Sequence, residues 1–450
     1  MKTNISQLIK RNTTNMIWCV FSTAICFFAV SCEDQGGTQK GSPYDPSKPI
    51  VLESFEPDSG GLATKVFING QNFGTDPSMI KVYYNKARAA VVGSDGEHLY
   101  VVTPRQPGDT CDITVAVGDG AHVLGKDSVV FDRQFRYRTS VTVTTIAGRK
   151  GARELVGGTL TAATFDQPST LCTDAEGNIF MSHWRVPYGF VMISEKRNLV
   201  QVLYTGDPLG VPTADAEGKV IMAPTDSGDG YYSFDPDAQW APKRRLILHP
   251  TATEQAAGKK DFTINYKHAM AANKLDGHIY TRSHNGQLVR FDPVTRAGEQ
   301  VAEGLLPSND SYLTFHPVQH NLLLITYPGQ HAIYTYDLDT KEHNLFAGIR
   351  SDAGWQDGER LNARFNTPSQ VIVDQDGSIM IADYGNHCIR KIDPDGIVTT
   401  VIGKGGKADW VDGNPDDAMF NNPKGVAIDR DYNIYVADFS NNCVRKLAIE

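Results

Sequence analysis

The chain has 450 residues and a hydrophobic content of 40%, which allows two or three domains with large buried cores. It carries 43 Lys and Arg residues against 52 Asp and Glu residues, a formal net charge of −9. The basic residues are scattered, so composition and charge argue against a surface that neutralises nucleic-acid phosphates. We therefore expect no nucleic acid partner.

Residues 1–31 are predicted to be a lipoprotein signal peptide. Basic residues precede an apolar run over residues 16–30, which is shorter than the about 20 apolar residues that a transmembrane helix needs. The run ends in Ala29-Val30-Ser31-Cys32, a motif that resembles a bacterial lipobox. The resemblance implies that Cys32 is lipidated and begins the mature protein. An ordinary secretory signal, cleaved near the same place, is the alternative.

Two acidic residues directly after Cys32 indicate where in the cell the protein is located. Glu33 and Asp34 resemble the acidic tag of surface-exported lipoproteins in Bacteroidetes. The resemblance implies a protein of the cell envelope that is anchored by its lipid to the outer membrane and exposed at the cell surface. Membrane contact is then expected through the lipid anchor.

The next segments are a linker and a small β domain. Residues 32–48 are rich in Gly, Pro and Ser, which predicts a flexible lipidated tether. Residues 49–138 read as short alternating strands separated by turn signals, which predicts a β-sandwich. Residues 54–76 closely resemble the opening of the IPT/TIG immunoglobulin-like family, a Pro-x-x-Gly turn followed by a strand and Gly-x-Asn-Phe-Gly. The residues that match this pattern are Pro57, Gly60, Gly70, Asn72, Phe73 and Gly74.

The rest of the chain, residues 140–450, repeats one phrase. Gly, Phe, Pro and Asp recur at one spacing as Gly148, Phe165, Pro168 and Asp174, as Gly348, Phe365, Pro368 and Asp374, and as Gly403, Phe420, Pro423 and Asp429. Six strand-turn-strand units follow one another, at residues 169–183, 210–224, 269–283, 312–327, 370–383 and 425–438. The Phe-x-x-Pro motif, with Asn-x-Cys-[Ile/Val]-Arg-Lys after it, resembles NHL repeats. We predict an all-β chain, an Ig-like sandwich followed by a six-bladed NHL-type β-propeller.

The two ends of the repeat region are predicted to pair. The last unit stops at Glu450 after a third strand, whereas the isolated segment 140–148 matches the fourth strand of the preceding unit. Residues 140–148 are therefore expected to supply the outer strand of the last blade and to close the ring.

Four cysteines remain after the signal peptide and lipidation are removed. Cys388 and Cys443 occupy the same place in two successive repeats, too far apart for the roughly 6 Å Cα separation that a disulfide prefers. Cys111 and Cys172 complete the set. We expect all four to be buried or partly buried thiols without a disulfide.

One face of the predicted propeller carries the candidate ligand-binding residues. The loops after the second strands begin with rings in four units, and the long loops between blades add two tryptophans on the same face. Flat rings beside polar groups stack on sugars while the polar groups bond the hydroxyls. The candidates are Trp184, Arg185, His284, Tyr384, Phe439, Trp355 and Trp410. Packing of these loops against neighbouring blades is the alternative for each ring.

Five histidines are candidate metal ligands. His183, His268, His284, His331 and His387 could converge on the channel mouth, and some NHL propellers, such as peptidyl-hydroxyglycine lyases, are similar in using histidines around a zinc ion. The chain lacks a closely spaced His or Cys pair, so no metal and no cofactor are predicted, with His183 and His284 as the candidates if a metal is present. The standard hydrolase motifs are absent.

Three functions follow from these features. The first is a non-catalytic surface lipoprotein that binds a polysaccharide or oligosaccharide for an outer-membrane uptake complex, by analogy with Bacteroidetes lipoproteins of this architecture. The second is a metal-dependent propeller lyase or lactonase-type hydrolase. The third is a scaffold for protein–protein interaction. We favour the first and name no catalytic residue.

Overall fold

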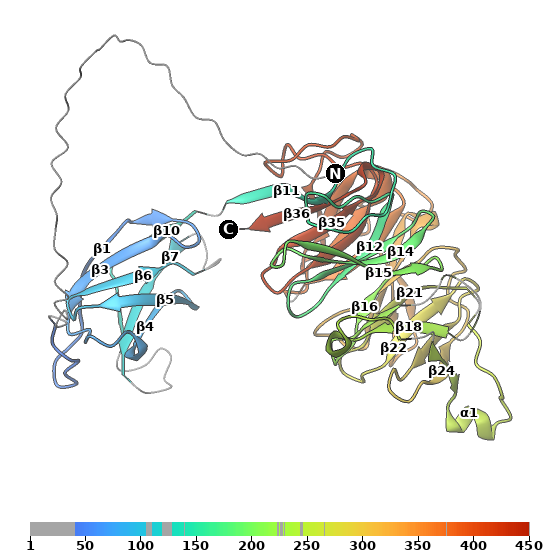
Figure 1. The fold of residues 1–450 in the computed structure, drawn as a ribbon, viewed down its shortest axis with the longest axis horizontal. Coiled ribbons are helices and arrows are strands. Elements are labelled where there is room, and N and C mark those ends of the chain that lie inside the picture. The colour runs from blue at the N-terminus through green and yellow to red at the C-terminus, as the bar shows by residue number, and fades with distance from the viewer. Residues whose placement is uncertain are drawn as a thin grey trace, which may run out of the picture.

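The computed structural model describes residues 41–104, 110–118, 128–138, 140–222, 225, 228, 230–243, 246–264, 266–374 and 376–449. The predicted signal peptide, Cys32 with its lipidation, and residues 33–40 of the predicted tether lie outside these residues. In the described part, no helix has the length and apolar character needed to cross a membrane. The fold is almost entirely β (Figure 1).

The N-terminal unit is a β-sandwich. Its larger sheet has the order β1 (Val51–Glu56), β3 (Lys65–Gln71), β6 (His98–Val102), β5 (Ala87–Ser94), β4 (Ile80–Tyr84), β8 (Ile113–Val117) and β9 (Ser128–Val130). The smaller sheet has the order β2 (Ser59–Gly60), β10 (Phe135–Tyr137) and β7 (Thr110–Cys111), and a single turn, η1 (Pro77–Met79), precedes β4. Buried and exposed side chains alternate along β3, as expected of a strand with one face in the core. Phe55, Tyr84 and Phe135 contact one another in that core.

Part of the predicted tether is folded onto this sandwich. Asn72 has a left-handed backbone with φ of 66°, and its side chain holds residues 45–48. The Asn72 amide accepts a bond from the Asp45 N–H at 2.9 Å and donates to the Lys48 carbonyl at 2.8 Å. A flexible tether over all of residues 32–48 is therefore wrong for its last residues, because the Gly-x-Asn-Phe-Gly turn anchors them.

Residues 141–449 form six small sheets, written here from the first strand outward. Sheet 1 has β12 (Pro168–Thr173), β13 (Ile179–His183), β14 (Tyr188–Ser194) and β15 (Leu199–Gly206); sheet 2 has β16 (Thr213–Ala214), β17 (Val220–Met222), β18 (Gly230–Phe234) and β19 (Leu246–Ile247). Sheet 3 has β21 (Lys267–Ala272), β22 (Ile279–Ser283), β23 (Leu288–Phe291), β24 (Ala297–Ala302) and the short β20 (His249–Pro250).

The remaining sheets follow the same plan. Sheet 4 has β25 (Tyr312–Phe315), β26 (Leu322–Tyr327), β27 (Ala332–Asp337) and β28 (His343–Ala347); sheet 5 has β30 (Pro368–Val373), β31 (Ile379–Asp383), β32 (Cys388–Ile392), β33 (Ile397–Ile402) and β29 (Gly358–Glu359). Sheet 6 has β34 (Pro423–Ile428), β35 (Ile434–Asp438), β36 (Cys443–Ile449) and β11 (Val141–Gly148). The helical turns are α1 (Ala252–Ala256), η2 (Pro236–Ala238), η3 (Pro328–Gln330), η4 (Tyr384–Asn386) and η5 (Phe439–Asn441).

The first strands of these sheets form a closed ring. β12 contacts β16, and the contacts continue through β21, β25, β30 and β34 back to β12. Strand β11 pairs antiparallel with β36 from Val141 opposite Ile449 to Gly148 opposite Cys443, which confirms that the two ends of the repeat region share a sheet (Figure 1). The six strand-turn-strand units predicted from the sequence supply the first two strands of the six sheets.

Residues repeated in the sequence fill equivalent places in the core. Phe165, Phe365 and Phe420 are fully buried, each in a hydrophobic cluster between neighbouring sheets. The cysteine prediction is also confirmed. Cys111, Cys388 and Cys443 are buried and Cys172 is partly buried, and all four are free thiols.

Three left-handed residues join neighbouring sheets by one hydrogen bond each. The ring nitrogen Nδ1 of His331 accepts the Thr367 N–H at 3.0 Å, and Nδ1 of His387 accepts the Asn422 N–H at 3.0 Å. At the junction of sheets 6 and 1, Asn442 does the same through its side-chain oxygen, which accepts the Gln167 N–H at 3.0 Å. His331 and His387 are therefore structural joints between sheets.

These joints make stability depend on pH. Desolvation by burial lowers the pKa of both His331 and His387 below the ordinary 6.5. The unfolded chain then binds more protons than the folded one, so stability falls as the pH drops below about 6.5, at a limiting slope of about 1.4 kcal/mol per pH unit for each histidine. Both rings are half-buried, so solvent screening keeps the effect below that limit.

A double variant tests the joints. His331→Asn with His387→Asn keeps the acceptor and the left-handed backbone, as Asn442 shows, but removes the titration. We expect the free energy of unfolding to fall less between pH 7 and pH 5 than in the wild type, measured by urea unfolding. Equal losses in both proteins would contradict this role.

Candidate functional site at the mouth of the ring

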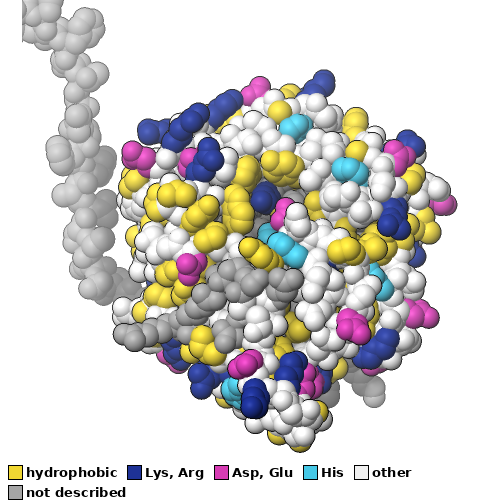
Figure 2. All heavy atoms as spheres, turned by 90° about the vertical axis from the view of Figure 1, so that its right-hand side faces the viewer, with side chains coloured by type: hydrophobic (Ala, Val, Ile, Leu, Met, Phe, Trp, Pro, Cys, Tyr) yellow, Lys and Arg dark blue, Asp and Glu magenta, His cyan; other side chains and the backbone are white. Residues whose placement is uncertain are grey.

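The predicted ligand face is defined by how the first two strands of each sheet meet. Pro423 at the start of β34 lies opposite Asp438 at the end of β35, and Pro168 lies opposite His183 in the same way. The start of each first strand therefore lies beside the loop that follows the second strand. Figure 2 shows a hollow on one face of the molecule, with basic, acidic and histidine side chains at its centre and hydrophobic side chains around them.

Rings from three sheets meet around one lysine at this mouth. The Lys424 ammonium lies 5.0 Å from the centroid of the Trp184 ring and 5.2 Å from that of Phe439. Phe439 in turn contacts Tyr384 edge to face at 6.0 Å between centroids. Sheets 1, 5 and 6 thus each place an aromatic side chain here, and the lysine sits at distances typical of cation–π contacts.

A histidine and an aspartate complete the mouth on its other side. The ring of His268, near the start of β21, lies 6.4 Å from Trp184 and 5.4 Å from Tyr312, between centroids. Its Nε2 is 3.2 Å from a carboxylate oxygen of Asp310, and its Nδ1 faces the Ser311 carbonyl at 3.2 Å. We call Trp184, His268, Asp310, Tyr312, Tyr384, Lys424 and Phe439 the mouth site.

Burial changes the acid–base behaviour of this site. Desolvation lowers the pKa of Lys424, and the charge of Asp310 opposes that shift. Desolvation also lowers the pKa of His268, and the charge of Asp310 again opposes the shift. The site is thus poorly solvated, and its charged groups interact more strongly than they would at an open surface.

Gln370 links three of the first strands of the ring by side-chain hydrogen bonds. The Gln370 side-chain oxygen accepts N–H bonds from Leu171 at 2.9 Å and from Val426 at 3.2 Å, and its amide donates to the Leu171 carbonyl at 2.5 Å. Gln370 therefore ties sheets 5, 1 and 6 together across the axis and is itself buried.

Two other predicted residues lie close to the mouth. His284 stacks on Tyr266 at 5.0 Å between centroids, and Tyr266 is 48% exposed. Arg185 follows Trp184 and lies 3.6 Å from the Asp166 carboxylate, with more than half of its side chain exposed. Of the seven predicted residues, Trp184, Tyr384 and Phe439 join the mouth site, while His284 and Arg185 flank it.

Trp355 and Trp410, which are predicted to lie on the same face, contact the outer strands of their sheets, and ligand binding by them stays a prediction. The indole N–H of Trp355 donates to Thr400 at 3.0 Å, and that of Trp410 donates to Thr145 at 2.9 Å. Thr400 and Thr145 belong to β33 and β11, the fourth strands of their sheets. Because strands are spaced about 4.8 Å apart, these tryptophans lie about 14 Å outward from the first strands. Their loops run outward to cover sheet edges.

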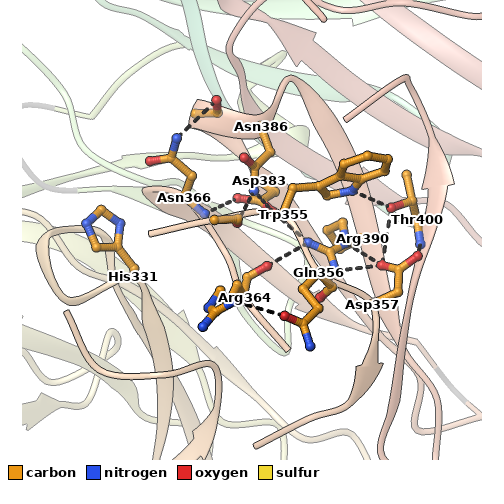
Figure 3. Close-up of polar contacts among 12 residues, drawn as sticks. His331, Trp355, Gln356, Asp357, Arg364, Asn366, Asp383, Asn386, Arg390 and Thr400 are labelled. Carbon is orange, nitrogen blue, oxygen red and sulfur yellow. Dashed lines mark hydrogen bonds and ion pairs between the residues drawn. The ribbon is translucent and has the colours of Figure 1, made fainter. Parts of the chain in front are cut away.

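A buried network explains why these loops run outward (Figure 3). The Arg390 guanidinium bonds Asp383 at 3.0 Å and Asp357 at 2.6 Å, and Asp357 follows Trp355 in the loop. Asp383 also accepts the Asn366 N–H at 2.8 Å. In sheet 6, Arg445, Asp438 and Asp412 repeat the arrangement. Burial raises the pKa of Asp383 and Asp438 to about 6, opposed by their arginines.

His183 is the counterpart of these aspartates and is fully engaged. Its Nε2 accepts the Asp166 N–H at 2.9 Å, the bond that Asp383 and Asp438 make in their sheets, and Nδ1 donates to the Pro187 carbonyl at 3.0 Å. Both ring nitrogens are used in hydrogen bonds, so His183 has a structural role in this sheet. Within the described ranges, no group of three His, Cys, Asp or Glu side chains could hold a metal ion.

Lys424, Asp310 and Tyr312 were missed as site residues by the sequence analysis. For Lys424 a signal existed, since sheets 1 and 5 have Ser169 and Ser369 directly after the repeated proline, where sheet 6 has the lysine. Asp310 and Tyr312 lie where the repeat motif is degenerate, and no pattern marks them. Two clefts of about 460 and 450 Å³ open among the turns on the opposite face, away from the mouth site.

Comparison with known proteins agrees with this architecture. The IPT/TIG domain family matches residues 50–137, and the NHL repeat family matches residues 365–392 and 420–447. The chain thus contains an IPT/TIG domain followed by NHL repeats, in an all-β, propeller-like fold. Sheets 5 and 6 hold the two matched repeats, and the other sheets share their geometry with weaker sequence signals.

Similar structures come from Bacteroides. The chain is similar to a structural genomics protein of unknown function from Bacteroides thetaiotaomicron, at 28% identity and a TM-score of 0.75, over 91% of this chain and 100% of that one. It is also similar to an auxiliary nutrient binding protein from Bacteroides ovatus, at 25% identity and a TM-score of 0.61, over 91% and 100% of the two chains.

A curated protein matches over a shorter stretch. The chain is 33% identical over 121 residues to Protein SUPPRESSOR OF QUENCHING 1, chloroplastic, of Arabidopsis thaliana, which covers 25% of this chain. The chain spans only 11 to 14% of the length of the curated relatives that it matches. These relatives therefore bear on the repeats and not on the function of the whole protein.

Proposed function

We propose that this protein is a non-catalytic binding protein of the cell envelope that captures a nutrient at the mouth of its ring. The observation that carries the proposal is the meeting of Trp184, Tyr384 and Phe439, from three sheets, at the mouth of the ring. A concave site with rings and a few polar groups binds a small ligand or the end of a chain. The similar Bacteroides ovatus protein is described as an auxiliary nutrient binding protein, which supports the same role.

The ligand of this proposal is a glycan, either a polysaccharide or an oligosaccharide. A pyranose ring presents apolar C–H faces that stack on aromatic side chains, while its hydroxyls need polar partners at the edge of the site. At the mouth, the rings of Trp184 and Tyr384 are partly exposed, and the half-exposed Asp310 carboxylate lies beside His268. This combination of ring faces and polar groups suits a sugar better than a purely apolar ligand.

The proposal also includes a location. A lipid on Cys32 would hold the protein on the outer membrane, with the sandwich between the anchor and the ring, and a glycan bound at the mouth would pass to an outer-membrane uptake complex. The lipobox and the acidic residues after it motivate this part. Labelling with radioactive palmitate in wild-type and Cys32→Ala cells tests the anchor.

Binding to a glycan panel tests the function. In the mature protein, Trp184→Ala should weaken binding roughly 10- to 100-fold, the effect of losing about 1.5–3 kcal/mol of apolar contact. Trp410→Ala is the matched control, because that ring lies on an outer strand and is bonded to Thr145. Titration calorimetry measures both. An unchanged affinity in the Trp184 variant, or an equal loss in the control, would contradict the site.

A further inference from the structure

The ammonium group of Lys424 has an unusual environment for a partly buried charge. It lies between the rings of Trp184 and Phe439, and no hydrogen bond or ion pair joins it to the residues that the structure describes. We propose that Lys424 binds an anionic group of the ligand, so that the mouth site selects acidic glycans, which bear carboxylate or sulfate groups. This inference rests on the proposed function and names its substrate class.

Other basic groups over aromatic rings in this protein show what is missing at Lys424. Arg390 lies over Phe365 and Arg445 over Phe420, and each is bonded to buried and half-exposed carboxylates. Lys446 lies over Tyr435 and is paired with Glu195 at 2.9 Å. In these three cases an acidic side chain compensates the cation. Buried Arg282, which lies over Tyr327, is instead bonded to the Ser308 carbonyl and the Ser311 hydroxyl.

Asp310 does not fill that role for Lys424. The Asp310 carboxylate is half exposed and lies 3.2 Å from His268, whose Nδ1 is held by the Ser311 carbonyl. The Asp310 carboxylate makes no direct contact with Lys424. Its negative charge nevertheless opposes the lowering of the Lys424 pKa that desolvation causes. Asp310 therefore helps to keep the lysine charged, while the ammonium hydrogens stay available to a ligand.

Nothing in the ring itself requires a lysine at this position. Sheets 1 and 5 have Ser169 and Ser369 there, and both are buried. The Ser369 hydroxyl donates to the Lys424 carbonyl at 2.7 Å, a backbone contact that any residue at position 424 would keep. Removing the charge should therefore leave the fold intact. A lysine ammonium that no described side chain pairs with is an acceptor for an anionic group, in a chain whose net charge is −9.

The experiment compares ligands that differ only in charge. Oligogalacturonides are matched with the same oligosaccharides after reduction of their carboxyl groups. Sulfated galactan oligosaccharides, which carry sulfate but no carboxylate, are matched with their desulfated forms and separate sulfate from carboxylate recognition. We expect the wild type to bind one acidic probe with roughly tenfold or more higher affinity than its neutral match, because one charge-assisted hydrogen bond is worth about that much. The Lys424→Met variant should lose this preference. Lys424→Arg should keep most of it.

Controls separate this inference from the proposed function. Lys404→Met removes a charge from an exposed loop of sheet 5 and should leave the preference unchanged. Unchanged melting temperature of Lys424→Met shows that the fold is intact. If the wild type binds neutral and acidic probes equally, and Lys424→Met matches it, the inference is wrong although the glycan function stands. If no glycan binds at all, the function and the inference fall together.

Discussion

A chain that starts at residue 140 is expected to fold, whereas one that starts at residue 150 is expected to be unfolded or aggregated. The difference is strand β11, the outer strand of sheet 6. It pairs with β36 from Val141 to Gly148 and buries Val143 and Ala147 in two hydrophobic clusters. The backbone hydrogen bonds and the apolar burial that the shorter chain loses contribute together on the order of 5–10 kcal/mol to the free energy of unfolding. This is comparable with the whole free energy of unfolding of a domain.

Without β11, the last strand would also be left as an open edge. β36 is seven residues long, and such an edge invites pairing with other chains. Circular dichroism and gel filtration of the two truncated chains measure the effect. Addition of a peptide covering residues 140–149 should restore the folded signal of the shorter chain. If the two chains melt at the same temperature without that peptide, β11 does not hold the ring closed.

Asp438→Ala is expected to destabilise the protein by about 3–5 kcal/mol, the usual cost of leaving a buried charge without its partner. The Arg445 side chain is fully buried, and Asp438 is the buried one of its two carboxylates, at 3.0 Å. The same carboxylate accepts the Asn421 N–H at 2.7 Å and the Asn441 amide at 2.8 Å. Its removal thus leaves Arg445 with only the half-exposed Asp412 as a charged partner and takes an acceptor away from two donors.

Chemical denaturation of three variants measures this effect. Asp383→Ala in sheet 5 should lose a similar amount, since Arg390 has the same two carboxylate partners there. Asp416→Ala, at an exposed position of the preceding loop, is the control and should change the free energy of unfolding by less than about 0.5 kcal/mol. A loss below about 1 kcal/mol in both buried variants would show that the network is not a stabilising element.

Much of the fold could be predicted because its signals are local. The six strand-turn-strand units follow from alternation within short segments, and the identity of residues 141–148 as an outer strand follows from their likeness to β33. Phe365 and Asp383 could likewise be assigned to the structure, because a residue repeated in equivalent units fills equivalent places. The degenerate middle sheets were found through alternation alone.

The candidate site was predicted less well, for a geometric reason. Chain connectivity assigns a loop to one face of the ring, and on that basis Trp355 and Trp184 belong together. It does not give the distance from the axis. That distance depends on the pairing of β29 with β33 and on Asp357 reaching Arg390, which draw the Trp355 loop over the outer strand.

The sequence by itself thus determined the strand units, the order of the two domains and the pairing of the two ends, because each rests on a repeated local pattern. Tertiary structure decided which side chains share the mouth. Ring closure brings Trp184 of sheet 1 against Lys424 of sheet 6, two residues far apart in the chain. Lys424 stands where sheets 1 and 5 have a serine, and only the folded ring shows that two aromatic rings lie beside its charge while no acidic side chain among the described residues is paired with it.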